Sequence, residues 1–300
     1  MAHVALISHD AGGAEILSSW LNRGNVEASI AVEGPAKEIF TRKCPSVNFV
    51  SAKNAITEAD WVLSGTGWQS NFEIDAIALA KSMRKKSVAF LDHWVNYRER
   101  FCRNGKIILP DEIWVGDLEA EKIALELFSV PVVLNENPYV LDLREELSSI
   151  RSHQNRVPGT RILYVCEPIA DHALTQFGNR RHWGYTEIDA LKFFLFNLSA
   201  FQMPIHSITV RPHPSEGSLK YEWVCSQTSV PVNFGGKKSL IEEIIDADIV
   251  VGCESMALVI ALHASKRVIS SIPFGGRKCQ LPHPGIERLS DWCSMGERHF

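Results

Sequence analysis

Residues 3–13 read HVALISHDAGG, an apolar run that ends in polar residues and a pair of glycines. A short apolar run of this kind is typical of a buried strand in a parallel sheet. Apolar side chains then recur at helical spacing, at Ile16, Leu17 and Trp20, so a helix is predicted directly after the glycines. Strand, glycine turn and helix in succession predict the opening of a βαβ unit.

The alternation of strands and helices continues through the first half of the chain. Further strands are predicted at residues 28–32, 61–64, 87–91, 112–115 and 130–134. Helices are predicted at residues 36–42, 71–83 and 118–128. This repeated alternation predicts a mostly parallel sheet covered by helices on both faces.

Around residues 145–160 the apolar periodicity lapses, and serine, asparagine, proline and glycine cluster with arginines. A segment of this composition is predicted to be a linker. The alternation then restarts, with strands predicted at 161–166, 207–211, 248–252 and 267–270. Helices are predicted at 185–198, 219–226, 239–247 and 255–263. We therefore expect an α/β protein of two Rossmann-like domains, residues 1–150 and 160–300, whose parallel sheets face a central cleft.

Bulk composition argues against several classes of protein. The 300 residues carry a formal net charge of -4 without a basic stripe, which argues against a nucleic-acid binder. The seven cysteines are scattered without CxxC spacing, which argues against a disulfide framework and a structural zinc site. The N-terminus lacks a signal-peptide pattern, and the longest apolar stretch, around residues 193–203, is shorter than the roughly 18 residues a membrane span needs. A cytoplasmic protein is expected.

Ligands of open parallel sheets bind at the carboxyl ends of the strands, so polar residues that follow the predicted strands are the candidate site residues. In the first half these are His9, Asp10, Asp92 and His93, together with the loop glycines Gly12, Gly13 and Gly65. In the second half they are Glu167, Arg211, His213, Glu254 and Ser255. No DxD-like acidic pair stands at a strand end, so the chemistry is expected to need no metal and no cofactor.

The first-half candidates combine carboxylates with imidazoles, the usual proton carriers near neutral pH. Asp10 or Asp92 is predicted to act as the base, with His9 and His93 in reserve. The glycine pair lacks the GxGxxG pattern of dinucleotide sites, and a tight β–α turn is the alternative explanation for it. For Asp92 and His93 the alternative is a capping carboxylate and a packed aromatic pair.

The most distinctive feature of the second half is Arg211-Pro212-His213-Pro214. The prolines fix the backbone around an imidazole, and an arginine and a histidine at a strand end form a natural phosphate clamp. The alternative is a rigid surface turn. Ser255 stands at an N-cap position, where its hydroxyl and the following amides suit a phosphate; plain helix capping is the alternative.

The C-terminal half resembles the nucleotide-sugar-binding domain of GT-B glycosyltransferases. The resemblance covers roughly residues 161–275 and is carried by RPHP at 211–214, ADIVVG at 247–252 and ESMAL at 254–258. The His-Pro pair is similar to that of bacterial sialyltransferases and of related capsule and teichoic-acid transferases. In those families the histidine contacts the donor phosphate. The acidic-acidic-glycine motif of some sialyltransferases is absent here.

This resemblance implies a metal-independent bacterial glycosyltransferase of GT-B type, active in polysaccharide biosynthesis. It places His213 and Ser255 at the donor phosphate, with Arg211 and Glu254 beside them. Glu167 is assigned to the same donor site by its position after a predicted strand. It points to a CMP-linked acidic sugar as donor and to a surface-polysaccharide or glycolipid acceptor. A lipid-linked acceptor would bring the protein to the membrane periphery.

Two other functions are open on the sequence. The first is a nucleotide-sugar hydrolase or non-hydrolysing epimerase of the same architecture, in which His9 activates water or moves a proton. The second is a non-catalytic subunit that binds a nucleotide sugar.

Overall fold

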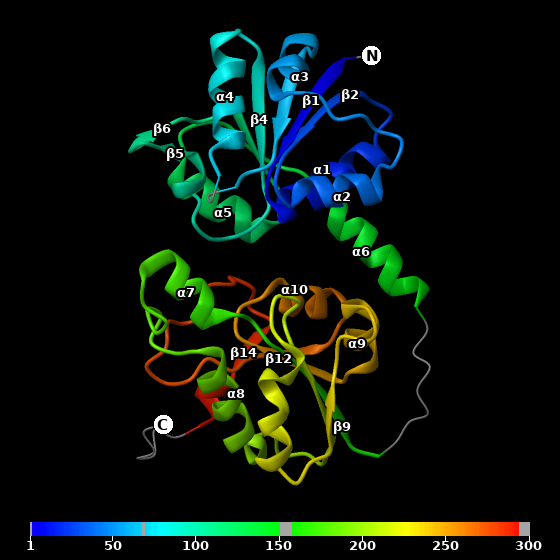
Figure 1. Cartoon of the computed structure of the whole chain (residues 1–300), viewed down its shortest axis with the longest axis vertical. Helices are drawn as coiled ribbons and strands as arrows, with labels where there is room; N and C mark the ends of the chain where they lie inside the picture. The colour runs from blue at the N-terminus through cyan, green and yellow to red at the C-terminus, as the bar shows by residue number, and fades with distance from the viewer. Residues whose placement is uncertain (1, 68–69, 151–157, 294–300) are drawn as a thin grey trace. The chain divides into compact units, whose positions relative to one another are not determined.

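The computed structural model describes residues 2–67, 70–150 and 158–293, and the chain divides into two compact units (Figure 1). Unit 1 is Met1–Leu143 and unit 2 is Arg144–Phe300. The predicted linker is helical in its first residues, because α6 (Pro138–Ser149) extends into it. The buried residues of α6, Pro138 and Leu143, lie in its first half. The second half lacks apolar periodicity, and for that reason the sequence predicted a linker there. Residues 151–157 of the predicted linker lie outside the described residues.

Unit 1 contains a six-stranded parallel sheet in the order β2-β1-β3-β4-β7-β8. Its strands are β1 (His3–Ser8), β2 (Glu27–Val32), β3 (Trp61–Ser64), β4 (Lys86–Leu91), β7 (Glu112–Val115) and β8 (Val132–Leu134). The connecting helices are α1 (Ala11–Arg23), α2 (Ala36–Lys43), α3 (Ala52–Glu58), α4 (Phe72–Ser82) and α5 (Leu118–Leu127). A short turn and hairpin follow β4, namely η1 (Glu99–Phe101), β5 (Cys102–Arg103) and β6 (Lys106–Ile107). The strands and helices predicted for this half are confirmed, whereas α3, α6 and the β5–β6 hairpin were not predicted.

Unit 2 contains a second six-stranded parallel sheet, in the order β11-β10-β9-β12-β13-β14. Its strands are β9 (Thr160–Val165), β10 (Ile205–Arg211), β11 (Val232–Phe234), β12 (Ile249–Gly252), β13 (Arg267–Ser270) and β14 (Ile286–Arg288). Its helices are α7 (Ile169–Phe177), α8 (Glu187–Phe196), α9 (Leu240–Asp246) and α10 (Met256–His263). Three 3-10 segments complete it, η2 (Leu198–Phe201), η3 (Ser218–Ser226) and η4 (Leu289–Trp292). The segment predicted as a helix at 219–226 is thus a 3-10 helix, and α7, β11 and β14 were not predicted.

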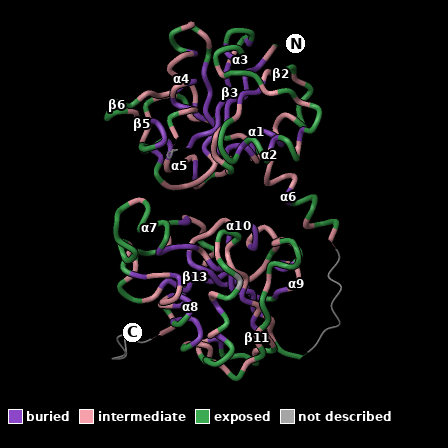
Figure 2. Tube along the Cα trace, viewed as in Figure 1, coloured by how far each residue is buried: buried purple, intermediate pink, exposed green. Residues whose placement is uncertain are grey.

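The strands read as continuous apolar runs because both faces of each sheet are covered. In β1, Val4 and Leu6 pack in one cluster with residues of α1 and α2. Ala5 and Ile7 point to the opposite face and pack with residues of α3 and α4. Figure 2 shows the buried positions concentrated along the strands of both units. This two-sided burial leaves only the strand ends free for polar side chains.

The glycine pair was predicted to lie in a loop, and this prediction is wrong. Helix α1 begins at Ala11, so Gly12 and Gly13 occupy its first turn. A Cβ atom at Gly12 would stand 1.9 Å from Asp92 Oδ2, and one at Gly13 would stand 3.0 Å from the Cα of Gly65. The glycines therefore let the start of α1 pack directly against the ends of neighbouring strands.

Candidate functional site

In both sheets the strand order reverses beside the first strand of the unit. Counted along unit 2, the sheet order is 3-2-1-4-5-6, as in dinucleotide-binding Rossmann folds. In unit 1 a parallel bridge between Ile30 and Phe49 stands where a third strand would pair with β2. A ligand crevice is expected where the order reverses, after β1 and β3 in unit 1 and after β9 and β12 in unit 2.

The end of β1 carries a hydrogen-bonded pair of proton carriers. His9 Nδ1 lies 2.8 Å from Asp10 Oδ1, and both side chains are 24% exposed. A Cβ atom at Gly34 would stand 2.6 Å from His9 Nε2, and one at Gly67 would stand 2.8 Å from Asp10 Cγ. Bare backbone therefore makes room for both side chains. Asp10 stands at the N-cap position of α1 without making a capping hydrogen bond, since its carboxylate faces His9 instead.

Asp92 lies at the same edge of the sheet, directly after β4, and its charge is already paired. Arg100 Nη1 lies 2.5 Å from Asp92 Oδ1, with the side chains 5% and 11% exposed. Thr66 donates its hydroxyl to the same oxygen at 3.3 Å, and Arg100 also donates to the Thr66 carbonyl. Asp92 Oδ1 is thus already occupied by two hydrogen-bond donors. Asp92 therefore holds Arg100 and Thr66 in place and leaves Asp10 as the more available carboxylate.

His93 lies against its neighbour. Its ring centroid is 5.3 Å from that of Trp94 in an edge-on arrangement, and its Nδ1 accepts the Trp94 backbone N–H at 2.9 Å. This is the packed aromatic pair that the sequence left open as an alternative. Trp94 in turn donates its indole N–H to Asp117, the N-cap of α5.

A buried glutamate that the sequence analysis missed supports the His9–Asp10 pair. Glu73 of α4 is 2% exposed, and its Oε1 accepts the backbone N–H of His9 at 2.6 Å and that of Asp10 at 3.4 Å. Burial raises the pKa of Glu73, the His9 amide opposes this, and the charge of Asp10 adds to the rise. Among the described residues its Oε2 is buried without a hydrogen-bond partner. The available signal was a charged residue on the apolar face of a predicted helix.

In unit 2, Arg211 at the end of β10 is already paired with a residue of α9. Its Nη1 donates to Glu243 Oε2 at 2.7 Å and to the Lys238 carbonyl at 3.0 Å. A cavity of about 310 Å³ has Lys238 and Glu243 in its lining. As a phosphate clamp, Arg211 would have to leave Glu243.

His213 is half-buried beyond the end of β10. Its Nδ1 lies 2.7 Å from Ser215 Oγ and accepts the Ser215 backbone N–H at 3.2 Å. Burial lowers the pKa of His213, Glu216 opposes this, and His172 adds to the lowering. The ring is therefore neutral at pH 7. No hydrogen bond joins His213 to Ser255 within the described part of the chain; their loops follow β10 and β12, which flank β9.

The loop before α10 already holds a carboxylate. Glu167, directly beyond β9, accepts the backbone N–H groups of Cys253 and Glu254 with its Oε1, each at 2.9 Å. Burial raises the pKa of Glu167 to about 7 against the pull of these amides. Ser255 caps α10, because its Oγ accepts the Ala257 N–H at 3.1 Å. A phosphate at this place would compete with Glu167 for the amides.

Glu254 is also held by protein groups. It pairs with Arg277 and accepts the Gln280 backbone N–H at 3.1 Å. Arg277 in turn lies over the Trp183 ring, 5.0 Å from its centroid. The ends of β9 and β12 thus bring Glu167, Glu254 and Ser255 together, while Arg211 pairs with Glu243.

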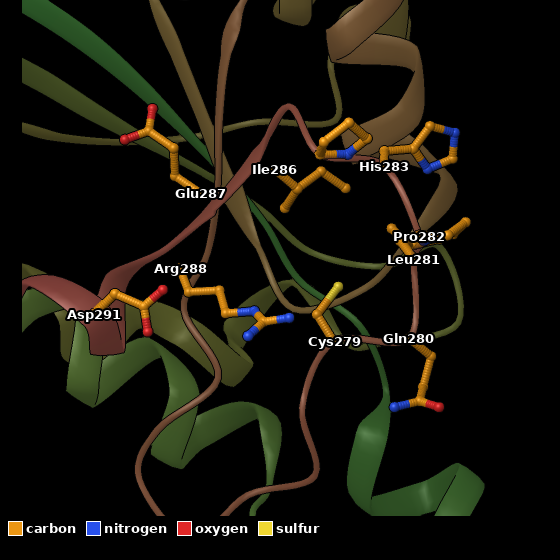
Figure 3. A pocket seen from close by; sticks show the side chains of 10 residues that line it. Cys279, Gln280, Leu281, Pro282, His283, Ile286, Glu287, Arg288 and Asp291 are labelled. Carbon is orange, nitrogen blue, oxygen red and sulfur yellow. The ribbon is translucent and has the colours of Figure 1, made fainter. Parts of the chain in front are cut away.

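A larger cavity, of about 490 Å³, lies beside the edge strand β14. Figure 3 shows its lining, which comes from the segment between Cys279 and Asp291. None of the site residues predicted from the sequence lines it. In residues 2–67, 70–150 and 158–293 no group of three or more His, Cys, Asp or Glu side chains is arranged to hold a metal ion. Among the described helices, none combines the length and apolar character needed to cross a bilayer.

No protein-family model matches the chain, and no curated protein sequence matches it. Solved structures do match. UDP-GlcNAc 2-epimerase from Neisseria meningitidis bound to UDP-GlcNAc aligns with a TM-score of 0.61 at 11% identity, over 89% of this chain and 82% of that chain. UDP-GlcNAc 2-epimerase from Methanocaldococcus jannaschii aligns with a TM-score of 0.57 at 11% identity, over 89% and 83%.

The glycotransferase of kitacinnamycin aligns with a TM-score of 0.55 at 11% identity, over 96% of this chain and 85% of that chain. At such low identities the likeness shows the fold. The chain therefore has an α/β fold with two parallel sheets, consistent with two Rossmann-like domains of GT-B type.

Proposed function

We propose that the chain is an enzyme that acts on a nucleotide sugar, with His9 and Asp10 of unit 1 moving the proton. The observation that carries the proposal is the 2.8 Å contact between His9 Nδ1 and Asp10 Oδ1 at the crevice after β1. A carboxylate on Nδ1 orients an imidazole for proton transfer through Nε2. Their partial exposure keeps both groups within reach of a substrate.

The nucleotide sugar would bind through its phosphates in unit 2, at His213 and the loop before α10. His213 offers a hydrogen-bond donor, and the resemblance to the His-Pro glycosyltransferases supports this placement. Structural neighbours bound to UDP-GlcNAc add further support. The proposal requires neither a cofactor nor a metal ion.

Glycosyl transfer is one reaction for which the chain has suitable residues. In that case the His9–Asp10 pair would deprotonate an acceptor hydroxyl, and His213 would stabilise the charge that develops on the leaving phosphate. The acceptor would be a surface polysaccharide or glycolipid, and the donor a CMP-linked or UDP-linked sugar.

Hydrolysis or epimerisation of the nucleotide sugar is the second candidate. It is favoured by the same pair, since an oriented histidine can activate water or move a proton on the sugar without an acceptor. Two of the solved neighbours named above are UDP-GlcNAc 2-epimerases. This candidate needs no acceptor site.

Incubation of the protein with UDP-GlcNAc or a CMP-linked acidic sugar, without acceptor, separates the two reactions. Release of free sugar or appearance of an epimer, followed by proton NMR, supports the second candidate. Turnover that appears only with an added saccharide acceptor supports the first. If the protein binds the nucleotide sugar but Asp10→Asn has the same activity as the wild type, the chain is a non-catalytic subunit instead.

A further inference from the structure

The segment after β10 fixes the imidazole of His213 in one state. The backbone N–H of Ser215 donates to His213 Nδ1 at 3.2 Å, and the Ser215 hydroxyl lies 2.7 Å from the same nitrogen. A backbone N–H can only donate, so Nδ1 must present its lone pair. In the neutral ring the proton therefore sits on Nε2, which makes no hydrogen bond to any described residue.

Glu216 fixes the backbone of the same residue. Its side chain is 2% exposed, and its Oε2 accepts the His213 backbone N–H at 3.1 Å. Tyr221 donates its hydroxyl to Glu216 at 2.9 Å, and Lys220 donates to Glu216 Oε1 at 2.6 Å. Glu216 and the restriction by Pro212 together fix the backbone from which the ring projects.

The hydrogen-bond network of Glu216 extends through Lys220 to residues of α8 and α7. Lys220 Nζ lies 2.5 Å from Glu187 Oε1, and Glu187 Oε2 accepts the backbone N–H of Ala170 at 2.8 Å. Ala170 lies in the first turn of α7, which also carries His172. The loop of His213 is thereby tied to α7 through three buried or half-buried charges.

Two titratable groups act on the imidazole. Glu216 faces it from its own loop and favours the protonated ring, whereas His172 of α7 disfavours it. Lys220 lies one contact further away, between Glu216 and Glu187, and offsets only one of their two negative charges. With burial as the largest influence, the ring is neutral and its Nε2–H is an uncharged donor.

We propose that Ser215 and Glu216 are positioning residues that present His213 as an Nε2–H donor to a phosphate oxygen of the nucleotide sugar. Ser215 sets the tautomer, and Glu216 sets the backbone from which the ring projects. The inference rests on the proposed function for the identity of the ligand. The sequence pattern at the end of the strand predicted a role for His213 but none for Ser215 or Glu216.

The test combines binding with NMR of the full chain labelled with 15N-histidine. UDP-GlcNAc is the ligand, because its pyrophosphate is a diester without the terminal group that titrates near pH 6. We expect the His213 ring to show a protonated Nε2 and an unprotonated Nδ1 at pH 8. Glu216→Gln should lower the pKa of His213 further and raise the Kd roughly tenfold, as losses of supporting residues do. Ser215→Ala, at an exposed residue, should raise the Kd several-fold. This variant tests the inference if Glu216→Gln fails to fold.

A double-mutant cycle shows whether the effect passes through His213. In a His213→Ala background, Glu216→Gln should cost no further affinity, because its contribution acts through the missing ring. Glu222→Gln, at an exposed glutamate of the neighbouring η3, serves as the matched control and should behave like the wild type.

A Glu216→Gln loss that persists without the His213 ring, or a proton on Nδ1 in the wild type, would overturn the inference. If the wild-type protein binds no nucleotide sugar, the proposed function fails. The tautomer of His213 and its pKa in Glu216→Gln then still decide whether Ser215 and Glu216 position the ring.

Discussion

Asp10 and Asp92 follow strands of the same sheet, but their neighbours differ. Asp92 is 11% exposed and pairs with Arg100, which is 5% exposed. Removing one partner of a buried pair leaves the other charge uncompensated and costs about 3–5 kcal/mol. Asp92→Asn should therefore lower the free energy of unfolding by about 3 kcal/mol in urea denaturation. Asp10→Asn, at a side chain 24% exposed, should lower it by less than about 1 kcal/mol. Equal losses would contradict the different roles given to the two carboxylates.

Glu167 makes the stability of the protein depend on pH. Burial raises its pKa from 4.5 to about 7. Since the folded state binds this proton more tightly than the unfolded chain, the stabilisation is complete below pH 4.5 and is lost as the pH rises through about 7. The free energy of unfolding, taken as wild type minus Glu167→Gln, should fall by about 1–3 kcal/mol over that window. A difference that stays constant with pH would mean that Glu167 is ionised throughout.

The sequence predicted the strand-end residues of the site but not the groups that control them. His9, Asp10 and Glu167 follow apolar runs, and position alone marks them. Arg100 and Glu73 could not be found in this way, because each contacts the site from a different element. Whether a carboxylate at a strand end is free or paired is a property of tertiary contacts.

At the scale of elements, apolar periodicity predicted the buried strands and amphipathic helices well. It failed where an element is short or half-exposed, as in β11 and β14 at the sheet's outer positions. Helix α7 was missed because it lies between β9 and α8, within a connection where a single helix was expected. The prediction that Gly12 and Gly13 lie in a loop was wrong because glycine is favoured both in sharp turns and where the start of a helix packs closely against its neighbours.

The close packing of α1 makes a specific prediction. A methyl group at Gly12 would meet Asp92 Oδ2 at 1.9 Å and Asp92 Cγ at 2.9 Å, and Arg100 holds that carboxylate in place. Gly12→Ala gains about 1 kcal/mol of helix propensity, yet the overpacking should leave a net loss of about 2 kcal/mol in urea unfolding. Gly217→Ala is the matched control, because nothing lies within 4 Å of its Cβ position. A stabilised Gly12→Ala would show that α1 shifts freely against β4.

For the whole molecule, the proposed function assigns different parts of the chemistry to the two units. Unit 1 offers the His9–Asp10 pair, which can carry a proton. Unit 2 offers His213 as a hydrogen-bond donor, and there the Glu167 carboxylate already accepts backbone N–H groups. The same strand-order rule predicts both sets of strand-end residues. The side chains in unit 1 suit proton transfer, and those in unit 2 suit phosphate binding. Binding and turnover should therefore respond separately to substitutions in the two units.

This separation is measurable with UDP-GlcNAc by calorimetry and by turnover at saturating substrate. His213→Ala in unit 2 should raise the Kd at least about tenfold, because it removes a hydrogen bond to a charged ligand. His9→Ala in unit 1 should leave the Kd within about threefold and reduce turnover at least about a hundredfold, the range of acid–base catalysis. His206→Ala, at an exposed histidine of β10, is the control for both measurements. If His9→Ala weakens binding as much as His213→Ala, then His9 holds the substrate and the proton must be moved by another group.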